Sequence, residues 1–146
     1  MRCIGVLAAG LLAASGVAPA SAQDGSGQGT IGIELNRLDQ TDEGCRLFID
    51  FTNDLAFDLS ELGFELVLFD ADGQVHGLWE LKSGRVGQGR SRLKAFNFAD
   101  VACDAIARAR FNYVFECTAT DAELAADVCL DAVTLSSAAG VPLADR

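Results

Sequence analysis

The sequence lacks the short motifs that identify several common enzyme classes. It contains no G-x-S-x-G nucleophile turn, no P-loop, no H-E-x-x-H zinc pair and no C-x-x-C pair. Each of these motifs holds a nucleophile, a phosphate cradle, a metal ligand set or a reactive thiol in a fixed local geometry. We therefore expect a protein that is not an enzyme, with no catalytic residues and no cofactor.

Histidine is almost absent, since His76 is the single one in the chain. A catalytic base needs a nucleophile and an orienting group that converge on it, and a metal ion needs two or three further ligands. One histidine shows neither kind of convergence. We interpret His76 as an exposed strand residue and expect no metal site.

Basic residues are scarce compared with acidic ones. The chain has 11 Lys and Arg against 21 Asp and Glu, which gives a formal net charge of −10. Such a charge repels the phosphates of nucleic acids and the surface of anionic membranes. We expect no nucleic-acid partner.

Long apolar runs are absent beyond the N-terminus. The chain opens with Arg2, an apolar run over residues 4–17 and the small-residue site Ala20-Ser21-Ala22. This order is typical of a cleaved secretory signal peptide, and the run is too short to span a bilayer as a mature helix. We expect residues 1–22 to be removed, which leaves a periplasmic or secreted chain with no stable membrane insertion.

Five cysteines are present, and four of them follow the expected cleavage site. An even number in an exported chain indicates disulfides, and four cysteines allow three pairings. We favour Cys45 with Cys103 and Cys117 with Cys129, the second closing a short loop. A four-cysteine zinc site would need close cysteine pairs, which the spacing does not provide.

Apolar residues recur with a period of two over most of the remaining chain. After a flexible tail at 23–30, this pattern predicts one domain at 31–146 built of about seven strands. The expected strands cover residues 30–36, 45–54, 63–70, 74–82, 89–98, 108–117 and 131–136. Regular turn signals between them favour an antiparallel β-sandwich.

Two of the expected strands, 89–98 and 108–117, contain both basic and aromatic residues, and the alternation predicts which of these side chains point outward and which point inward. In 89–98, we place Arg90, Arg92 and Lys94 on an outward side, before Phe96 and Phe98 break the phase at a bulge. In 108–117, the alternation puts the side chains of four residues inside: Phe111, Tyr113, Phe115 and Cys117.

Two segments have helical rather than strand patterns. One is 100–107, around Cys103, and the other is 120–128, where Thr120 and Glu123 have the spacing of a capping box. We expect one or two short helices beside the strands.

Three segments together resemble a known group of proteins. They are "IELNRLDQTDEGCRLFIDFTN", "LGFELVLFDADG" and "CDAIARARFNYVFEC", from Ile31 to Cys117. They are similar to small exported bacterial proteins of unknown function, often labelled only by a Tat-type signal domain. The resemblance implies an immunoglobulin-like sandwich and supplies no activity. A Tat signal needs paired arginines, and Arg2 stands alone, so ordinary Sec export fits better.

The stretch Asp70-Ala71-Asp72-Gly73 has the composition of either a calcium loop or a hairpin turn. An EF-hand loop would continue with a third oxygen ligand and end in glutamate, but Gln74 and Leu81 occupy those positions. Its flanks alternate as strands, and Asp-Gly between such runs favours a tight hairpin. We predict a turn.

The basic residues are unevenly distributed, because seven lie between residues 82 and 110. If two of the strands are neighbours, five of these form a basic ladder: Arg90, Arg92, Lys94, Arg108 and Arg110. We interpret the ladder as a docking face for an acidic protein or a polyanionic envelope polymer. The alternatives for the ladder are a solvated edge strand protected by charge, or neutralisation by the protein's own aspartates. The alternatives for the protein are a small-ligand site or enzyme with no visible motif, and a surface for self-association.

Overall fold

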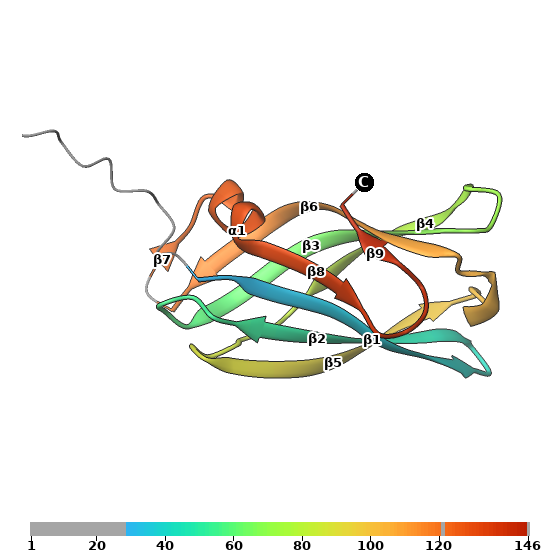
Figure 1. Cartoon of the computed structure of the whole chain (residues 1–146), viewed down its shortest axis with the longest axis horizontal. Coiled ribbons are helices and arrows are strands. Elements are labelled where there is room, and N and C mark those ends of the chain that lie inside the picture. The colour runs from blue at the N-terminus through green and yellow to red at the C-terminus, as the bar shows by residue number, and fades with distance from the viewer. Residues whose placement is uncertain (1–28, 121, 146) are drawn as a thin grey trace, which may run out of the picture.

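The computed structural model describes residues 29–120 and 122–145, with only the backbone of Ala122 and Glu123. The expected signal peptide at 1–22 and nearly all of the expected tail at 23–30 lie outside these residues. The described chain folds into two stacked sheets (Figure 1). This confirms an all-β sandwich.

The first sheet has the strand order β5-β2-β1-β8. Its members are β1 (Ile31–Thr41), β2 (Gly44–Asn53), β5 (Arg90–Ala99) and β8 (Val133–Ser137). Alternate residues of β2 are buried, as the period of two predicted, and they face the second sheet. Strand β8 pairs with β1 in the parallel direction, with Ile31 opposite Val133.

The second sheet has the order β4-β3-β6-β7, and β9 pairs with β6 in the parallel direction. Its members are β3 (Leu59–Phe69), β4 (Val75–Lys82), β6 (Arg108–Ala119), β7 (Ala122–Glu123) and β9 (Leu143–Ala144). The two parallel pairs make both sheets mixed, so the expectation of a purely antiparallel sandwich is wrong. Sequence periodicity shows which residues share a face, but it carries no information on strand direction.

Aromatic rings pack against one another in the space between the sheets. The Phe51 ring on β2 meets the Phe64 ring on β3 edge to face, with centroids 6.1 Å apart. Phe64 in turn stacks on Phe111 of β6 at 5.1 Å, and Trp79 of β4 meets Phe98 of β5 at 4.7 Å. The Phe51–Phe64 and Trp79–Phe98 contacts join opposite sheets, whereas Phe64 and Phe111 are on neighbouring strands of the second sheet. Burying these rings holds the two sheets together.

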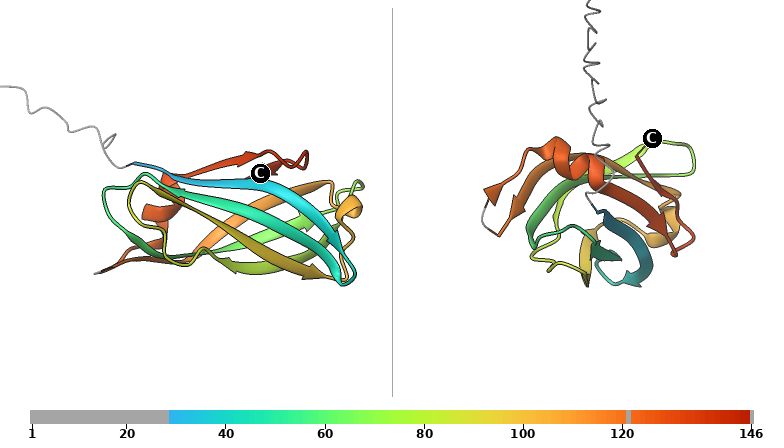
Figure 2. Two further views of the ribbon diagram at one scale, coloured as in Figure 1. Left: turned by 90° about the horizontal axis from the view of Figure 1, so that it is seen from below. Right: turned by 60° about the vertical axis from the view of Figure 1, so that its left-hand side comes forward.

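The expected helices are present but shorter or displaced. The segment near Cys103 forms one 3-10 turn, η1 (Cys103–Ala105), and the α-helix is α1 (Ala126–Ala132). The second expectation is therefore wrong in position, because residues 122–123 form β7. The residue before the helix is Ala125, which has no side-chain cap. Helix α1 lies at the end of the sandwich opposite the β3–β4 hairpin (Figure 1), and two further views show the strands from below and obliquely (Figure 2).

Two disulfides attach these helical segments to the sheets, and they are the two pairings favoured from the sequence. Cys45 at the start of β2 bonds Cys103 in η1, with their Cα atoms 4.9 Å apart. Cys117 near the end of β6 bonds Cys129 in α1, with their Cα atoms 6.1 Å apart. Each bond anchors a segment that connects the two sheets.

Candidate functional site

The basic residues of β5 do not lie on the outer face of their sheet. Strand β5 pairs with β2 without a register shift from Arg90 to Ala99, so the bulge expected before Phe96 is absent. Uninterrupted alternation puts Arg90, Arg92 and Lys94 on the same side as buried Phe98. The outward placement was therefore wrong: these side chains face the gap between the sheets, at its open edge.

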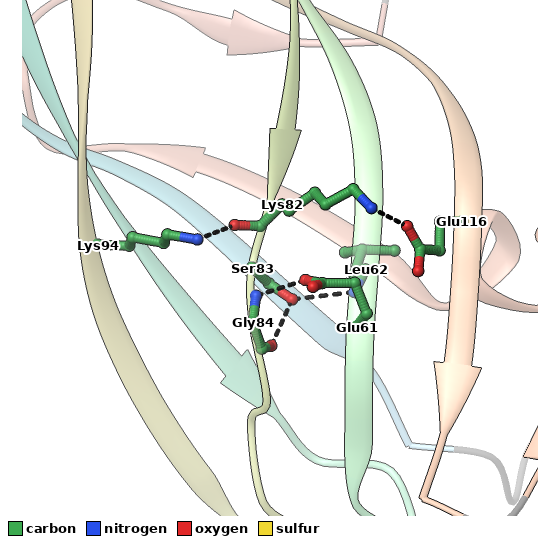
Figure 3. Close-up of polar contacts among 7 residues, drawn as sticks. All are labelled: Glu61, Leu62, Lys82, Ser83, Gly84, Lys94 and Glu116. Carbon is green, nitrogen blue, oxygen red and sulfur yellow. Dashed lines mark hydrogen bonds and ion pairs between the residues drawn. The ribbon is translucent and has the colours of Figure 1, made fainter.

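Two of these cations reach across that gap, Lys94 to the end of β4 and Arg92 to the loop that follows it. The Nζ atom of Lys94 donates a hydrogen bond of 2.5 Å to the carbonyl of Lys82, at the end of β4 (Figure 3). The guanidinium of Arg92 donates a 3.2 Å hydrogen bond to the carbonyl of Arg85. Lys94 lies opposite Ile49 and Arg92 opposite Phe51 in the ladder. The aliphatic stems thus cover the edge of the core while the charged ends remain at the surface.

Two further cations lie at the same edge and have acidic partners. Lys82 pairs with Glu116 of β6, and this hydrogen bond raises the pKa of the lysine above its ordinary value of 10.5. Arg85 pairs with Asp58 at 2.5 Å. We call the group formed by Lys82, Arg85, Arg90, Arg92 and Lys94 the basic edge.

The Asp58 carboxylate also orders the loop that carries Arg85. It accepts a 2.8 Å hydrogen bond from the main-chain N–H of Gln88 as well as the bond from Arg85. The main-chain bond and then the guanidinium hold the pKa of Asp58 below its ordinary value of 3.8. Both bonds favour the charged form of the carboxylate.

The loop after β4 is fixed from beneath by a buried hydroxyl. Ser83 is fully buried; its Oγ accepts the N–H of Leu62 at 3.0 Å and donates to the carbonyl of Gly84 at 2.7 Å. The Glu61 carboxylate accepts the N–H of Gly84 at 2.5 Å (Figure 3). Gly84 has a φ of +69°, and a side chain there would meet the guanidinium of Arg92 at 3.2 Å. These contacts hold the loop in one conformation.

Three cations of the basic edge have no carboxylate partner. Among residues 29–120 and 122–145, ion pairs join Arg37 to Asp39, Lys82 to Glu116 and Arg85 to Asp58. Arg92 and Lys94 are held by neutral carbonyls, and Arg90 is exposed. Their positive charges are therefore available to an anion that approaches this edge.

The two remaining residues of the expected basic ladder, Arg108 and Arg110, lie in the second sheet, away from β5. Arg108 and Arg110 are on β6, and β3 lies between β6 and β4 in the second sheet. Their guanidinium carbons lie 3.9 and 5.1 Å from the centre of the Phe69 ring on β3. The Nε atom of Arg110 is buried without a hydrogen bond in the described chain. The structure does not bring these two arginines together with Arg90, Arg92 and Lys94.

The contribution of Lys82 and Arg85 to this edge was missed in the sequence. Both belong to the seven basic residues between residues 82 and 110. Their positions on β4 and in the following loop gave no sign that they approach β5. The only available signal was the high density of cations between residues 82 and 94. Density alone cannot show which side chains meet, because that depends on how the two sheets stack.

The stretch Asp70-Ala71-Asp72-Gly73 is the hairpin turn between β3 and β4, as predicted. The Asp70 carboxylate accepts the N–H groups of Asp72 and Gln74 at 3.0 and 2.8 Å, and Gly73 has a φ of +78°. His76 is an exposed residue of β4 whose Nε2 atom lies 3.2 Å from the carbonyl oxygen of Ala105. The carboxylate is used to close the turn.

A cleft lies at the opposite edge of the sandwich. It has a volume of about 310 Å³ and separates β8 from β9 and α1. Its lining residues are Phe111, Leu130, Val133, Leu135, Leu143, Ala144 and Asp145. Asp145 is the single charged residue among them, and the other six side chains are apolar.

Groups of metal ligands, membrane-spanning helices and similarity to known proteins give no further indication of function. Within the described residues, no three His, Cys, Asp or Glu side chains are grouped to hold a metal ion. None of the helices in that part of the chain has the length and apolar character that crossing a membrane requires. Comparison with protein-family models, curated proteins and solved structures finds no match to this chain.

Proposed function

We propose that this protein is an exported, non-enzymatic binding module of the cell envelope. It docks an acidic protein, or a polyanionic envelope polymer, on its basic edge. The observation that carries the proposal is the set of three cations, Arg90, Arg92 and Lys94, that have no carboxylate partner in the described chain. In a protein with a net charge of −10, this edge is a distinct place for an anion to bind.

Preorganisation supports the same proposal. Lys94 is held by a carbonyl at the end of β4 and Arg92 by a carbonyl of the following loop, which Ser83 fixes. A side chain that is already ordered loses less conformational entropy when a partner binds. Arginine also retains further N–H donors after making one hydrogen bond, and its planar fork fits a carboxylate.

We also propose that the sandwich is immunoglobulin-like. The orders β1-β2-β5 and β4-β3-β6 correspond to A-B-E and C′-C-F of such domains. Strand β8 occupies a different place, since it pairs with β1 instead of β6. Export belongs to the same proposal, because two disulfides persist best in an oxidising compartment.

Binding to immobilised polyglutamate and to an anionic polysaccharide tests the docking surface. The main variant replaces Arg90, Arg92 and Lys94 by serine, and the comparison variant replaces Arg108 and Arg110 by serine. We expect the first variant to lose binding and the second to retain most of it. Near-UV circular dichroism checks that both variants are folded, and Arg90→Glu provides a milder change at the same edge.

The reverse outcome would remove the basis of the proposal. If all variants and the native protein retain polyanion equally, the basic edge is only a charge-protected sheet edge. If the variant at Arg108 and Arg110 is the one that loses binding, docking occurs on the outer face of the second sheet.

A small-ligand site is the second candidate, and the cleft beside β8, which is lined mostly by apolar side chains, favours it. Its volume of about 310 Å³ lies at the lower end of the range for ligand sites. This candidate would be supported if a fluorescent apolar probe binds the native folded protein and fails to bind the Leu135→Trp variant. Unchanged probe binding in that variant would contradict it.

A further inference from the structure

We propose that the partner binds as an added β-strand on the free edge of β5, through an extended segment in which acidic and apolar residues alternate. This inference rests on the proposed docking function and specifies how the partner is held. In β-augmentation, main-chain hydrogen bonds supply affinity, and the side chains on either side of the added strand supply specificity.

Strand β5 is the outermost strand of its sheet in the described part of the chain. It is ten residues long, has no register shift and contains no proline. Bulges and prolines are common devices that prevent other strands from pairing with an exposed edge. Strand β5 uses neither, so its edge is geometrically open to another strand.

The hydrogen-bond pattern shows which main-chain groups are open. The N–H of Asp100 donates to the carbonyl of Glu43 at 3.0 Å, in line with the β2–β5 register. Because bonded and non-bonded pairs alternate in an antiparallel ladder, the even-numbered residues from Arg92 to Phe98 bond β2, whereas the N–H of Arg90 donates to the carbonyl of Gly87 at 3.1 Å. The odd-numbered residues point their N–H and C=O groups to the free edge: Ser91, Leu93, Ala95 and Asn97.

The side chains of β5 define the composition of the partner. Arg90, Arg92 and Lys94 lie on the inner side, and Leu93, which is 57% exposed, lies between them on the outer side. An added strand places its own side chains alternately beside these two groups. Acidic residues at every second position meet the cations, and an intervening apolar residue covers Leu93.

Charge argues against a second copy of this chain as the occupant. Strand β5 carries three cations and no acidic residue, so a second β5 would bring three more cations to the same edge. Each copy also has a net charge of −10, which repels another copy at longer range. An acidic segment of a different protein can pair with the open main-chain groups of β5 and also carries the charge that its cations attract.

The test measures binding of a short peptide that alternates glutamate and valine to the disulfide-bonded protein by calorimetry. Two N-methylated forms of the peptide remove alternate N–H groups, either those that would face β5 or those that would face away. We expect methylation of one set to weaken binding by about tenfold or more and the other set to have little effect, since each main-chain hydrogen bond contributes about 1 kcal/mol.

Matched charge reversals show where the peptide binds. Arg90→Glu changes a cation of the basic edge, and Arg37→Glu makes the same change in net charge on β1. We expect Arg90→Glu to abolish binding and Arg37→Glu to leave it nearly intact. A scrambled peptide with consecutive glutamates should bind more weakly than the alternating one.

The possible failures are distinguishable. Equal weakening by the two methylation patterns, with loss of binding in Arg90→Glu, overturns strand addition and leaves docking by charge alone. Absence of binding to the peptide and to every polyanion overturns both proposals. A dimer of the free protein that prevents the peptide from binding, and that Arg90→Glu dissociates, would place a second copy on β5 and overturn the inference as well.

Discussion

At the residue scale, buried polar side chains hold the loops at the end of the sandwich where the basic edge begins. Asn53 is 0% exposed and lies at the end of β2. Its amide donates to the carbonyls of Phe57 and Val86, both at 2.9 Å, and accepts the N–H of Leu55 at 3.0 Å. One side chain thus satisfies three main-chain groups in the two segments that connect the sheets.

Replacing Asn53 by alanine should therefore be costly. The change leaves three main-chain groups without their partner, and we expect unfolding free energy to fall by about 3 kcal/mol or more. Urea denaturation with the disulfides intact measures the effect. The control is Asn97→Ala, an exposed residue, where a change of about 0.5 kcal/mol or less is expected. A similar small loss in both variants would show that water replaces the Asn53 amide.

Asp58 makes stability depend on pH at the acidic end. Its pKa is lower in the folded chain than the ordinary value of 3.8, because the Gln88 N–H and then Arg85 favour the charged form. A depressed pKa stabilises the fold above the unfolded pKa, and this contribution disappears as the pH falls through the folded pKa.

Asp58→Asn should thus lower the melting temperature at neutral pH and have less effect as the pH falls below about 3.8. Thermal melts of both proteins across this range provide the measurement. Asp72→Asn, a change in an exposed turn residue whose carboxylate makes no hydrogen bond in the described chain, is the control. A melting difference that stays constant with pH would exclude a role for the carboxylate charge.

At the scale of elements, each disulfide fixes a segment that would otherwise be held by few contacts. Cys45 and Cys103 are 58 residues apart, whereas Cys117 and Cys129 are 12 apart. The loop-entropy argument gives about 4 kcal/mol for the longer loop and about 3 kcal/mol for the shorter one. The first bond also holds η1 against the start of β2, where the chain crosses between sheets.

Replacing both members of the Cys45–Cys103 pair by alanine should therefore destabilise the protein by about 4 kcal/mol. His76→Ala, the control, removes one exposed contact, and we expect a loss of about 0.5 kcal/mol or less. Denaturant unfolding of the two variants measures the difference. Equal melting temperatures would contradict our interpretation of the disulfide and of His76.

The sequence predicted the strands better than their mutual placement. Alternation located β2 with its buried face, and Asp-Gly located the β3–β4 turn, because both depend on neighbouring residues. In β6, Phe111 and Cys117 are buried as expected, but Tyr113 is 42% exposed. The ladder between β3 and β6 shifts register at three places, whereas β5, where a bulge was expected, has no register shift. A bulge that reverses the inward face has no local sequence marker.

The site depended even more on long-range pairing. Arg90, Arg92 and Lys94 were found from their density, but their direction was mistaken, since the phase of β5 is set by Phe98 in the core. Arg108 and Arg110 were joined to them on the assumption that their strands are neighbours. The two strands belong to different sheets. Contacts across a sandwich follow from strand order, which local periodicity does not encode.

At the scale of the whole molecule, two opposite electrostatic effects coexist. The net charge is −10, so the excess acidic side chains repel one another in the folded chain. The basic edge attracts anions at one location. Both interactions act between exposed charges, so both weaken as salt shortens the screening length from about 30 Å at 0.01 M to about 8 Å at 0.15 M.

One salt titration should therefore move stability and binding in opposite directions. Between about 0.01 and 0.15 M NaCl, we expect the melting temperature to rise as self-repulsion is screened, while affinity for the acidic peptide falls several-fold. Arg90→Glu adds repulsion and removes an attractive charge, so its melting temperature should rise more steeply with salt than that of the native protein. Arg37→Glu should retain the salt dependence of binding, because its charge lies outside the basic edge. If salt leaves affinity unchanged while the melting temperature rises, the partner is held by main-chain and apolar contacts, and the cations of β5 serve only to protect its edge.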